Sequence, residues 1–283
     1  MEVNQLNETM GAEVTGIDLT QTLDDETKSA INKTFVDNLV ACFRGQNFDS
    51  PDAFLKGAGY LGTPVAPILT NYLLPGQKEV EALTSDAHDK RVGGIVPQRR
   101  GLTWHTDHSN IAEPPKATML YGIDIPSKGG DTQFINMYAA YDALSEDMKD
   151  FINGRRVLHV YQASRAPRKM GVRTKEQEDS SPGVWQPLVR LNPDTGRKAL
   201  YLNDMRMEEV EGLSEKETTD LLKELLDHCI QPRFQYSHKW QKGDVLVWDN
   251  RSTLHQGSAG IDPSERRYLH RVMLQGEAPV LAN

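Results

Sequence analysis

Three residues with metal-binding side chains constrain the fold of this chain more than any other feature. His105 and Asp107 are separated by one residue, whereas His255 lies far toward the C-terminus. In extended backbone, residues i and i+2 point to the same side, so His105 and Asp107 can bind one ion together. Two imidazoles and one carboxylate, with no fourth protein ligand evident, form the set that non-heme Fe(II) sites use when coordination positions must stay open. The fold must therefore bring His255 back beside the other two.

The surrounding motifs strengthen this metal interpretation. A His-x-Asp triplet alone is weak evidence, because a chain of this composition contains roughly one by chance. A surface histidine beside a turn aspartate is therefore the alternative. Three further polar residues follow in order, since Thr132 ends the run Gly129-Gly130-Asp131-Thr132 and Arg267 and Arg271 come shortly after His255. Buried arginines of this kind can create a positive site for a small anion.

The composition is that of a globular protein, and we expect neither nucleic acid nor a membrane as a partner. Of 283 residues, 38% are hydrophobic and 25% charged, which is enough for a sizeable core. The net charge of −8 argues against nucleic acid. No segment approaches the roughly 18 apolar residues of a membrane helix, and the first residues lack a signal-peptide pattern. Cys42 and Cys229 lie in apolar contexts, which suits a reducing compartment, so we expect a cytoplasmic protein.

Alternating short apolar runs and turn residues predict a protein that is mainly β with flanking helices. A strand is expected over 39–43, and eight more follow at 118–125, 132–135, 155–161, 187–191, 199–202, 233–237, 245–248 and 268–275. Eight such strands match a jelly roll, whose two packed sheets leave a mouth for a ligand. Helices are expected over 23–38, over 139–151 and after the capping box at 214–217.

Residues 162–185 differ from the rest of the chain. The segment is polar, contains several arginines and lysines, and has no periodicity. A structureless connection of this length is typical of an active-site lid, although a passive surface loop explains the pattern equally well. Both interpretations remain open at this stage.

Taken together, these motifs resemble the taurine/2,4-dichlorophenoxyacetate dioxygenase family, whose members depend on Fe(II) and 2-oxoglutarate. The likeness covers nearly the whole chain, which implies a single catalytic domain over 1–283. It rests on six segments, at residues 11–14, 43–46, 103–107, 129–132, 248–251 and 266–271. The family fold is a double-stranded β-helix, a form of jelly-roll core. Relatives form dimers or tetramers, so the resemblance also implies a homo-oligomer.

The resemblance assigns a role to six residues. His105, Asp107 and His255 match the iron ligands. Thr132 and Arg267 match the pair that holds the distal carboxylate of 2-oxoglutarate, and an arginine fork suits a carboxylate better than a lysine does. Arg271 matches the arginine that binds the acidic group of the substrate. Two alternatives stay open: Arg266 could replace its neighbour Arg267, and Arg271 could pair with a carboxylate of the protein itself.

The expected activity is hydroxylation of a small organic acid, a carboxylate or a sulfonate, with O2 consumed and succinate and CO2 released. Taurine fits poorly, because the taurine enzymes' polar pocket residues align with Thr63, Ala66 and Gly101 here. Desaturation or oxidative decarboxylation on the same iron, and a non-catalytic jelly-roll binding protein, are the alternatives. The remaining histidines are expected to be structural or, for His108, to point away from the metal, and both cysteines are expected to be inert.

Overall fold

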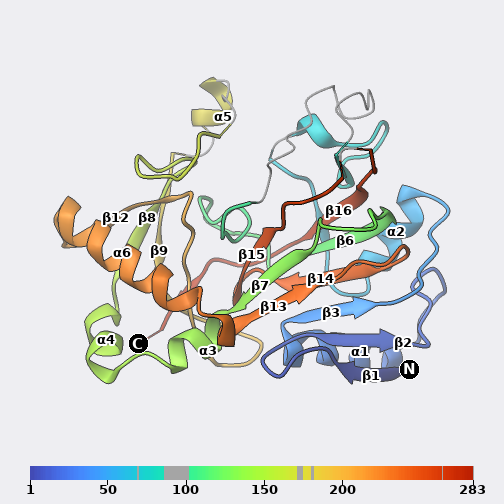
Figure 1. Cartoon of the computed structure of the whole chain (residues 1–283), viewed down its shortest axis with the longest axis horizontal. Helices are drawn as coiled ribbons and strands as arrows, with labels where there is room; N and C mark the ends of the chain where they lie inside the picture. The colour runs from blue at the N-terminus through green and yellow to red at the C-terminus, as the bar shows by residue number, and fades with distance from the viewer. Residues whose placement is uncertain (69, 86–101, 171–174, 180–181, 263, 283) are drawn as a thin grey trace.

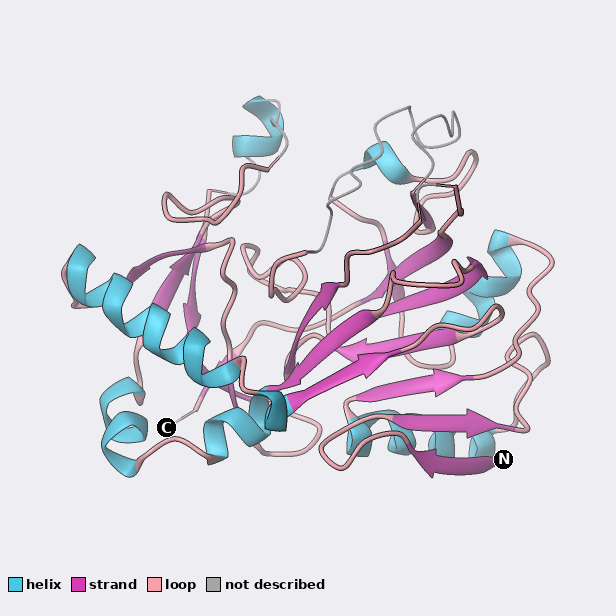
Figure 2. Ribbon diagram, viewed as in Figure 1, coloured by secondary structure: helices cyan, strands magenta, loops and turns pink. Residues whose placement is uncertain are grey.

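The computed structural model describes residues 1–68, 70–85, 102–170, 175–179, 182–262 and 264–282, and they form a mainly β protein with few helices (Figure 2). The strands are β1 Glu2–Gln5, β2 Ala12–Thr15, β3 Val40–Phe43, β4 Pro64–Val65, β5 Glu81–Thr84, β6 Ala117–Asp124, β7 Thr132–Asn136, β8 Arg156–His159, β9 Val184–Pro187, β10 Val189–Leu191, β11 Lys198–Leu200, β12 Met207–Val210, β13 Gln235–His238, β14 Val245–Asp249, β15 Thr253–Gly257, β16 Tyr268–Leu274 and β17 Val280–Leu281. The helices are α1 Asp25–Asn38, α2 Pro51–Ala58, α3 Met137–Asp142, α4 Glu146–Ile152, α5 Lys175–Asp179 and α6 Glu215–Cys229, with short 3-10 turns at Thr70–Tyr72 and Pro232–Phe234.

The largest sheet has the strand order β1-β2-β3-β14-β6-β16-β4, with β5 also paired to β16 (Figure 1). Only β2 and β3 pair in parallel within the described part of this sheet. Three smaller sheets have the orders β13-β7-β15, β12-β8-β9 and β11-β10-β17. The first of these, β13-β7-β15, packs against one face of the largest sheet, and the candidate site lies between the two.

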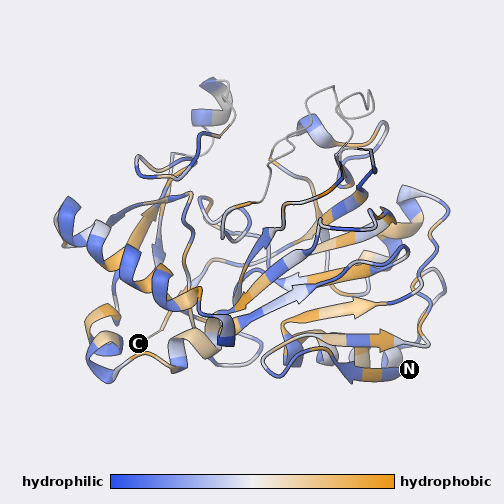
Figure 3. Ribbon diagram, in the orientation of Figure 1, coloured by the Kyte–Doolittle hydropathy of each residue, from blue (hydrophilic) through white to orange (hydrophobic). Residues whose placement is uncertain are grey.

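The largest sheet is buried on both faces, which explains why its central strands are apolar without alternation. In β3, Cys42 belongs to one hydrophobic cluster and Phe43 to the other. The cluster of Cys42 also holds Phe134 from β7, whereas the cluster of Phe43 holds Phe35 from α1 and Phe54 from α2. The strand is therefore apolar along its whole length (Figure 3). Helices α1 and α2 cover the face that is remote from β7.

The helix predictions are confirmed at two places and wrong at a third. Helix α6 begins at the predicted capping box, in which Ser214 and Glu217 bond each other's backbone N–H. Helix α1 covers most of the predicted 23–38. The predicted helix over 139–151 is instead two helices, because the Ser145 hydroxyl accepts a hydrogen bond from the backbone N–H of Met148 and starts α4 separately. The chain turns between α3 and α4.

Three further sequence predictions need correction. The segment 187–191 is not one strand, because the strand is interrupted at Leu188, between β9 and β10. The segment 233–237 begins as a 3-10 turn, in which Pro232 fixes the first position, and becomes extended only at Gln235. Residues 162–185 are not structureless, since their described part contains α5 and the start of β9. Figure 1 shows α5 apart from the main body of sheets.

No helix in the described ranges combines the length and the apolar character needed to cross a lipid bilayer. The predictions for His88 and Gly101 fall on residues 86–101, which lie outside the described residues.

Candidate active site

Two backbone hydrogen bonds bring the distant histidines of the predicted metal set together. The N–H of His105 donates to the carbonyl of His255 over 3.1 Å, and the N–H of His255 donates to the carbonyl of His105 over 2.8 Å. The two residues thus form a single antiparallel bridge between the loop at 105 and strand β15. Their imidazole rings lie 4.2 Å apart, centroid to centroid. The bridge fixes both ligands to one point of the fold.

The carboxylate of Asp107 completes a compact set of donor atoms. Its two oxygens lie 3.9 Å from His105 Nε2 and 3.9 Å from His255 Nε2, and one donor atom from each residue falls within 4.8 Å of the others. Asp107 and His255 are buried, and His105 is half-buried. Two imidazole nitrogens and one carboxylate oxygen are the facial donor set of non-heme Fe(II) oxygenases. The donor chemistry therefore fits an iron ion.

The local backbone differs from the expected extended strand. Residues 107–110 form a turn, and His108 has a positive φ of 49°. Side-chain directions alternate along an extended strand, which is why we expected His108 to point away from the metal. This alternation therefore stops at Thr106. His108 is not part of the donor set of Asp107 and the two histidines, and the direction of its side chain stays a prediction.

Both histidines of this donor set are held in the neutral form that metal binding would require. Burial lowers the pKa of His255 to about 3, and burial also lowers the pKa of His105. The Nδ1 atom of His105 lies 2.7 Å from the carbonyl oxygen of Thr103, which assigns the ring proton to Nδ1. The lone pair of Nε2 then faces Asp107. A carbonyl that fixes the tautomer in this way is typical of metal-binding histidines.

A chain of buried hydrogen bonds orients the carboxylate of Asp107. The hydroxyl of Thr118 donates to Asp107 Oδ2 over 2.6 Å, and the side-chain amide of Asn250 donates to that hydroxyl over 2.9 Å. The indole N–H of Trp248 donates to Asn250 over 3.0 Å, and its ring lies 4.7 Å from the His255 ring. Burial alone would raise the pKa of Asp107, but the neighbouring His255, Arg271 and His105 hold it well below its usual range.

The turn that carries Asp107 is held by hydrogen bonds from polar residues that the sequence motifs did not indicate. The amide of Asn203 donates to the carbonyl of Thr106 and to the hydroxyl of Ser109. The His159 ring lies 2.9 Å from the same hydroxyl, and the amide of Gln186 donates to the carbonyl of Ser109. These residues are far apart in the sequence, so no local motif indicates them. Thr118 and Asn250 were missed too, although Asn250 lies within the quoted 248–251 motif.

Thr132 lies on the same side of the small sheet as His255. In the pairing of β7 with β15, Phe134 is opposite His255 and Thr132 is opposite Gly257. Residues that are directly opposite point to the same face, so Thr132 and His255 are diagonal neighbours on that face. The Thr132 hydroxyl also accepts a hydrogen bond of 3.0 Å from the indole N–H of Trp240.

Arg267 is half-buried, and no carboxylate of the described residues lies in ion-pair contact with it. Burial lowers the pKa of its guanidinium to about 10, and the charge of Asp131 only partly opposes this effect. Its Nε donates to the carbonyl of Gly130 over 3.0 Å. Gly130 has a φ of +71°, and a Cβ there would lie 2.9 Å from Arg267 Cδ. The glycine therefore allows the arginine to approach closely.

Its neighbour Arg266 behaves differently. The Arg266 Nε lies 3.5 Å from Asp124 Oδ2, and its guanidinium lies over the Tyr268 ring. Arg266 thus has a protein carboxylate, whereas Arg267 has a half-buried positive charge with no carboxylate in ion-pair contact in the described part of the chain. The geometry favours Arg267 for the anion-binding role.

Arg271 pairs with a carboxylate of the protein, which was the open alternative for this residue. Its Nε and Nη2 atoms lie 2.7 Å and 2.6 Å from Glu81 Oε2, and the two residues are directly opposite in the pairing of β16 with β5. Glu81 is 1% exposed. Burial opposes the charge of Arg271, but Glu81 and Asp107 outweigh it and raise the pKa of Arg271. Glu81 is a site residue that the sequence argument missed, and a lone glutamate in the run Val80–Leu83 was its only signal.

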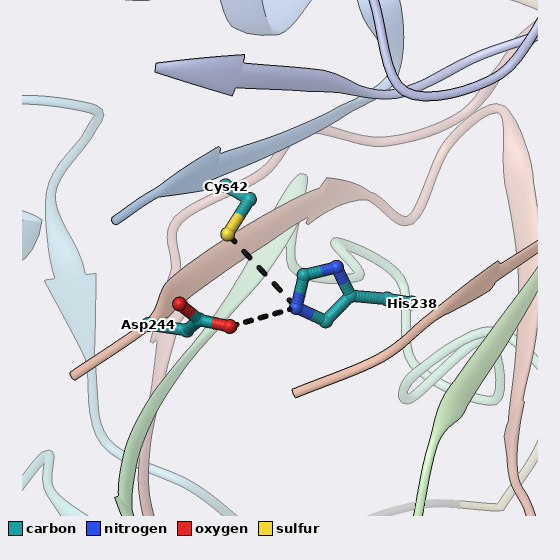
Figure 4. Close-up of side chains that lie close together, drawn as sticks. All are labelled: Cys42, His238 and Asp244. Carbon is teal, nitrogen blue, oxygen red and sulfur yellow. Dashed lines mark hydrogen bonds and ion pairs between the residues drawn. The ribbon is translucent and has the colours of Figure 1, made fainter. Parts of the chain in front are cut away.

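A second group of metal-ligating residue types consists of Cys42, His238 and Asp244 (Figure 4). His238 Nε2 lies 3.2 Å from Asp244 Oδ2 and 3.9 Å from Cys42 Sγ. That carboxylate oxygen already accepts hydrogen bonds from Arg44 and from the backbone of Gln241. Burial also raises the pKa of the Cys42 thiol, which disfavours a thiolate. An arginine on the carboxylate and a protonated thiol oppose cation binding, so this cluster is a buried polar network.

Comparison with known proteins identifies the family of this chain. The model of the taurine catabolism dioxygenase TauD, TfdA family matches residues 2–273. An alpha-ketoglutarate-dependent 2,4-dichlorophenoxyacetate dioxygenase of Cupriavidus pinatubonensis is 33% identical, with 98% of each chain covered. Pentalenolactone F synthase of Streptomyces arenae is 32% identical, over 93% of this chain and 89% of that protein. The crystal structure of AAD-2 in complex with Mn(II) and N-oxalylglycine has a TM-score of 0.84 at 27% identity and covers 99% of this chain and 100% of its own. The chain belongs to the TauD/TfdA family and is an enzyme that depends on 2-oxoglutarate (alpha-ketoglutarate), a dioxygenase.

Proposed function

We propose that this enzyme hydroxylates a small organic acid, a carboxylate or a sulfonate, with Fe(II) as metal and 2-oxoglutarate as cosubstrate, and releases succinate and CO2. The observation that carries the proposal is the half-buried guanidinium of Arg267, which has no ion-pair partner among the described residues. It contacts the same Trp240 side chain as Thr132, and Thr132 lies on the face of the small sheet that carries His255. A dianionic cosubstrate that spans the iron and this guanidinium would supply the missing negative charge. The name of the Cupriavidus relative indicates a carboxylate substrate for that protein.

His105, Asp107 and His255 would hold the iron. Bound together, Fe(II) and 2-oxoglutarate activate O2 for oxidation of a nearby C–H bond, with the keto acid decarboxylated to succinate. The protein keeps both imidazoles neutral and Asp107 ionised, so the donor set is ready for the metal near neutral pH. Trp248 and Phe134 pack beside His255 and exclude water from that side.

Thr132 and Arg267 would bind the distal carboxylate of the cosubstrate. The Nε edge of Arg267 is used by Gly130, which leaves the two terminal nitrogens for a carboxylate fork. The charge-assisted bonds form in a buried place, where they are stronger than in water.

Arg271 would contact the acidic group of the substrate with the end of its guanidinium that Glu81 leaves open, since the described contacts of Glu81 use Nε and Nη2. Glu81 balances part of the positive charge, so a substrate anion gains less from this arginine than from a free one. Desaturation and oxidative decarboxylation are alternative outcomes on the same iron, and product mass separates them from hydroxylation. The non-catalytic alternative is disfavoured, because relatives that match nearly the whole chain are dioxygenases.

Several broader features complete the proposal. The sheet β13-β7-β15 facing the largest sheet supports a double-stranded β-helix core in a single catalytic domain over 1–283. For residues 162–185 we keep both interpretations of the sequence, an active-site lid and a passive surface loop. The two buried free cysteines, Cys42 and Cys229, support a cytoplasmic location. We infer a homo-oligomer, a dimer or tetramer, which light scattering on the purified protein would test.

The decisive experiment has two stages. Adding Fe(II) and 2-oxoglutarate without oxygen should produce the visible charge-transfer band of a chelated keto acid. In air, a panel of aryloxy carboxylates, alkyl carboxylates and sulfonates should then include at least one acid that stimulates succinate release and gains one oxygen atom. A missing band would overturn the cosubstrate assignment. A band with no stimulating acid would overturn only the proposed substrate class.

A further inference from the structure

Trp240 contacts both residues of the carboxylate pair. It follows strand β13 by two residues, and 9% of its surface is exposed. Its indole N–H donates to Thr132 over 3.0 Å, and the guanidinium carbon of Arg267 lies 5.8 Å from the centre of its ring. We propose that Trp240 is a positioning residue for the 2-oxoglutarate carboxylate, which acts through Thr132 and Arg267. The inference rests on the proposed function of that pair.

The direction of the hydrogen bond gives the physical reason. An indole N–H can only donate, so the Thr132 oxygen must accept this bond. The hydroxyl proton of Thr132 then stays available for another acceptor. Without Trp240, the same hydroxyl could rotate and accept or donate elsewhere. The indole therefore leaves Thr132 as a donor, which is what a carboxylate acceptor needs.

The same ring limits the movement of Arg267. Its Nε is bonded to the carbonyl of Gly130, and the indole lies within cation–π distance of its guanidinium. The π face stabilises a charge that no carboxylate balances among the described residues. It does so without a full negative charge, so it does not compete with an incoming anion. Trp240 thereby keeps the guanidinium charged, in place and open to the cosubstrate.

The polar network of Figure 4 packs against the indole ring of Trp240 through His238. The His238 ring meets the Trp240 ring edge to face, 5.1 Å apart and at 89°. His238 is fixed by Asp244 at 3.2 Å and by the hydroxyl of Tyr236 at 2.9 Å. His238 is also opposite Thr132 in the pairing of β13 with β7, so strand register places His238 beside the residue that Trp240 positions. This gives the buried Cys42–His238–Asp244 cluster a role that needs no metal.

The test measures cosubstrate binding rather than turnover. Trp240→Phe removes the N–H and keeps an aromatic ring against Arg267 and His238. Titrating the anaerobic Fe(II) enzyme with 2-oxoglutarate, read from the charge-transfer band, should show about 3- to 10-fold weaker binding, the range expected for one hydrogen bond. Replacing Trp240 by benzothienylalanine, which has sulfur in place of the N–H, tests the same bond with the ring size kept, if the phenylalanine variant folds poorly.

A double-mutant cycle distinguishes positioning from general damage. Thr132→Val removes the hydroxyl through which Trp240 is inferred to act. In that background the loss of the indole N–H should weaken 2-oxoglutarate binding by less than about 2-fold. Equal losses in both backgrounds, or wild-type affinity in the single variant, would overturn the inference. A wild-type enzyme that gives no band would instead refute the proposed function, so the two failures are distinguishable.

Discussion

At the scale of single residues, the site combines an arginine that must stay charged with a histidine that must stay neutral. His255 is kept neutral by burial, whereas Arg267 remains cationic although burial lowers its pKa to about 10. Near neutral pH this value still leaves the guanidinium almost fully protonated. A guanidinium held partly out of water in this way gains charge-assisted hydrogen bonds from a bound anion. Individual substitutions should therefore separate metal binding from anion binding.

Removal of one metal ligand should abolish the reaction. His255→Ala takes away one of three protein donors, and turnover should fall below detection together with the charge-transfer band. Because His255 also bridges the loop at 105 through its backbone, which alanine retains, the fold should persist. Circular dichroism would check this. Full activity in the variant would exclude His255 as a ligand.

Adjacent arginines provide a matched pair of variants. Arg267→Lys should weaken 2-oxoglutarate binding by about 10-fold or more, since charge-assisted bonds contribute about 1.5–3 kcal/mol and lysine lacks the fork. Arg266→Lys should leave the dissociation constant unchanged, because Arg266 pairs with Asp124. Titration by the charge-transfer band compares the two. The reverse result would move the anion-binding role to Arg266.

At the scale of elements, the pairing of β5 with β16 buries an ion pair. Arg271→Met leaves the carboxylate of Glu81 buried without its partner, and unfolding free energy should fall by about 3–5 kcal/mol. Changing Glu81→Leu in the same chain removes the orphaned charge and should restore most of the stability. Urea unfolding of the two variants measures the difference. If the double variant were as unstable as the single one, the pairing would not explain the loss.

Helix α6 offers a simpler element-scale test. Ser214→Ala removes the hydroxyl that accepts from the backbone N–H of Glu217, so unfolding free energy should fall by about 0.5–2 kcal/mol. Glu224→Gln, on the exposed middle of the same helix, is the control and should cost almost nothing. Cosubstrate affinity should be the same in both variants, since α6 carries none of the site residues.

What the sequence could predict at this scale depended on how local the signal is. The capping box of α6 and the strand over 245–248 were found because the residues that determine them are adjacent. The break between α3 and α4 was missed, because Leu144 and Ser145 differ little in pattern from helix residues and the side-chain bond of Ser145 decides the start. Glu81 and Trp240 were missed for the opposite reason. Their partners, Arg271 and Thr132, are remote in sequence. Strand register brings Glu81 opposite Arg271, and Trp240 reaches Thr132 from just beyond the end of β13.

At the scale of the whole molecule, the site joins two sheets that the sequence only implied. His255 and Thr132 belong to the small sheet, whereas Arg271 and Glu81 belong to the largest one. The six proposed site positions rest on the family resemblance, which does not indicate how the rest of the fold supports them. The supports, from Asn203 to Trp240, come from loops and strands that follow no motif.

Ligands that engage both sheets should stabilise the entire fold. Mn(II) with N-oxalylglycine, at about 100 times the dissociation constant, should raise the unfolding free energy by about 2.7 kcal/mol. The rise should vanish in His255→Ala and shrink in Arg267→Lys. Thermal unfolding with and without the pair of ligands provides the measurement. A stabilisation that survives loss of His255 would mean that the metal binds elsewhere.

The carboxylate beneath Arg271 has a consequence for how such an enzyme diversifies. Glu81 lies on β5, which pairs with β16 outside the main strand path, and it contacts neither the three metal donors nor the Thr132 subsite in the described structure. Exchanging it for a neutral side chain of similar size would alter which charges the reaction chamber accepts while the oxidising machinery stayed intact. New chemistry of recognition could thus arise at one position, with no redesign of the catalyst.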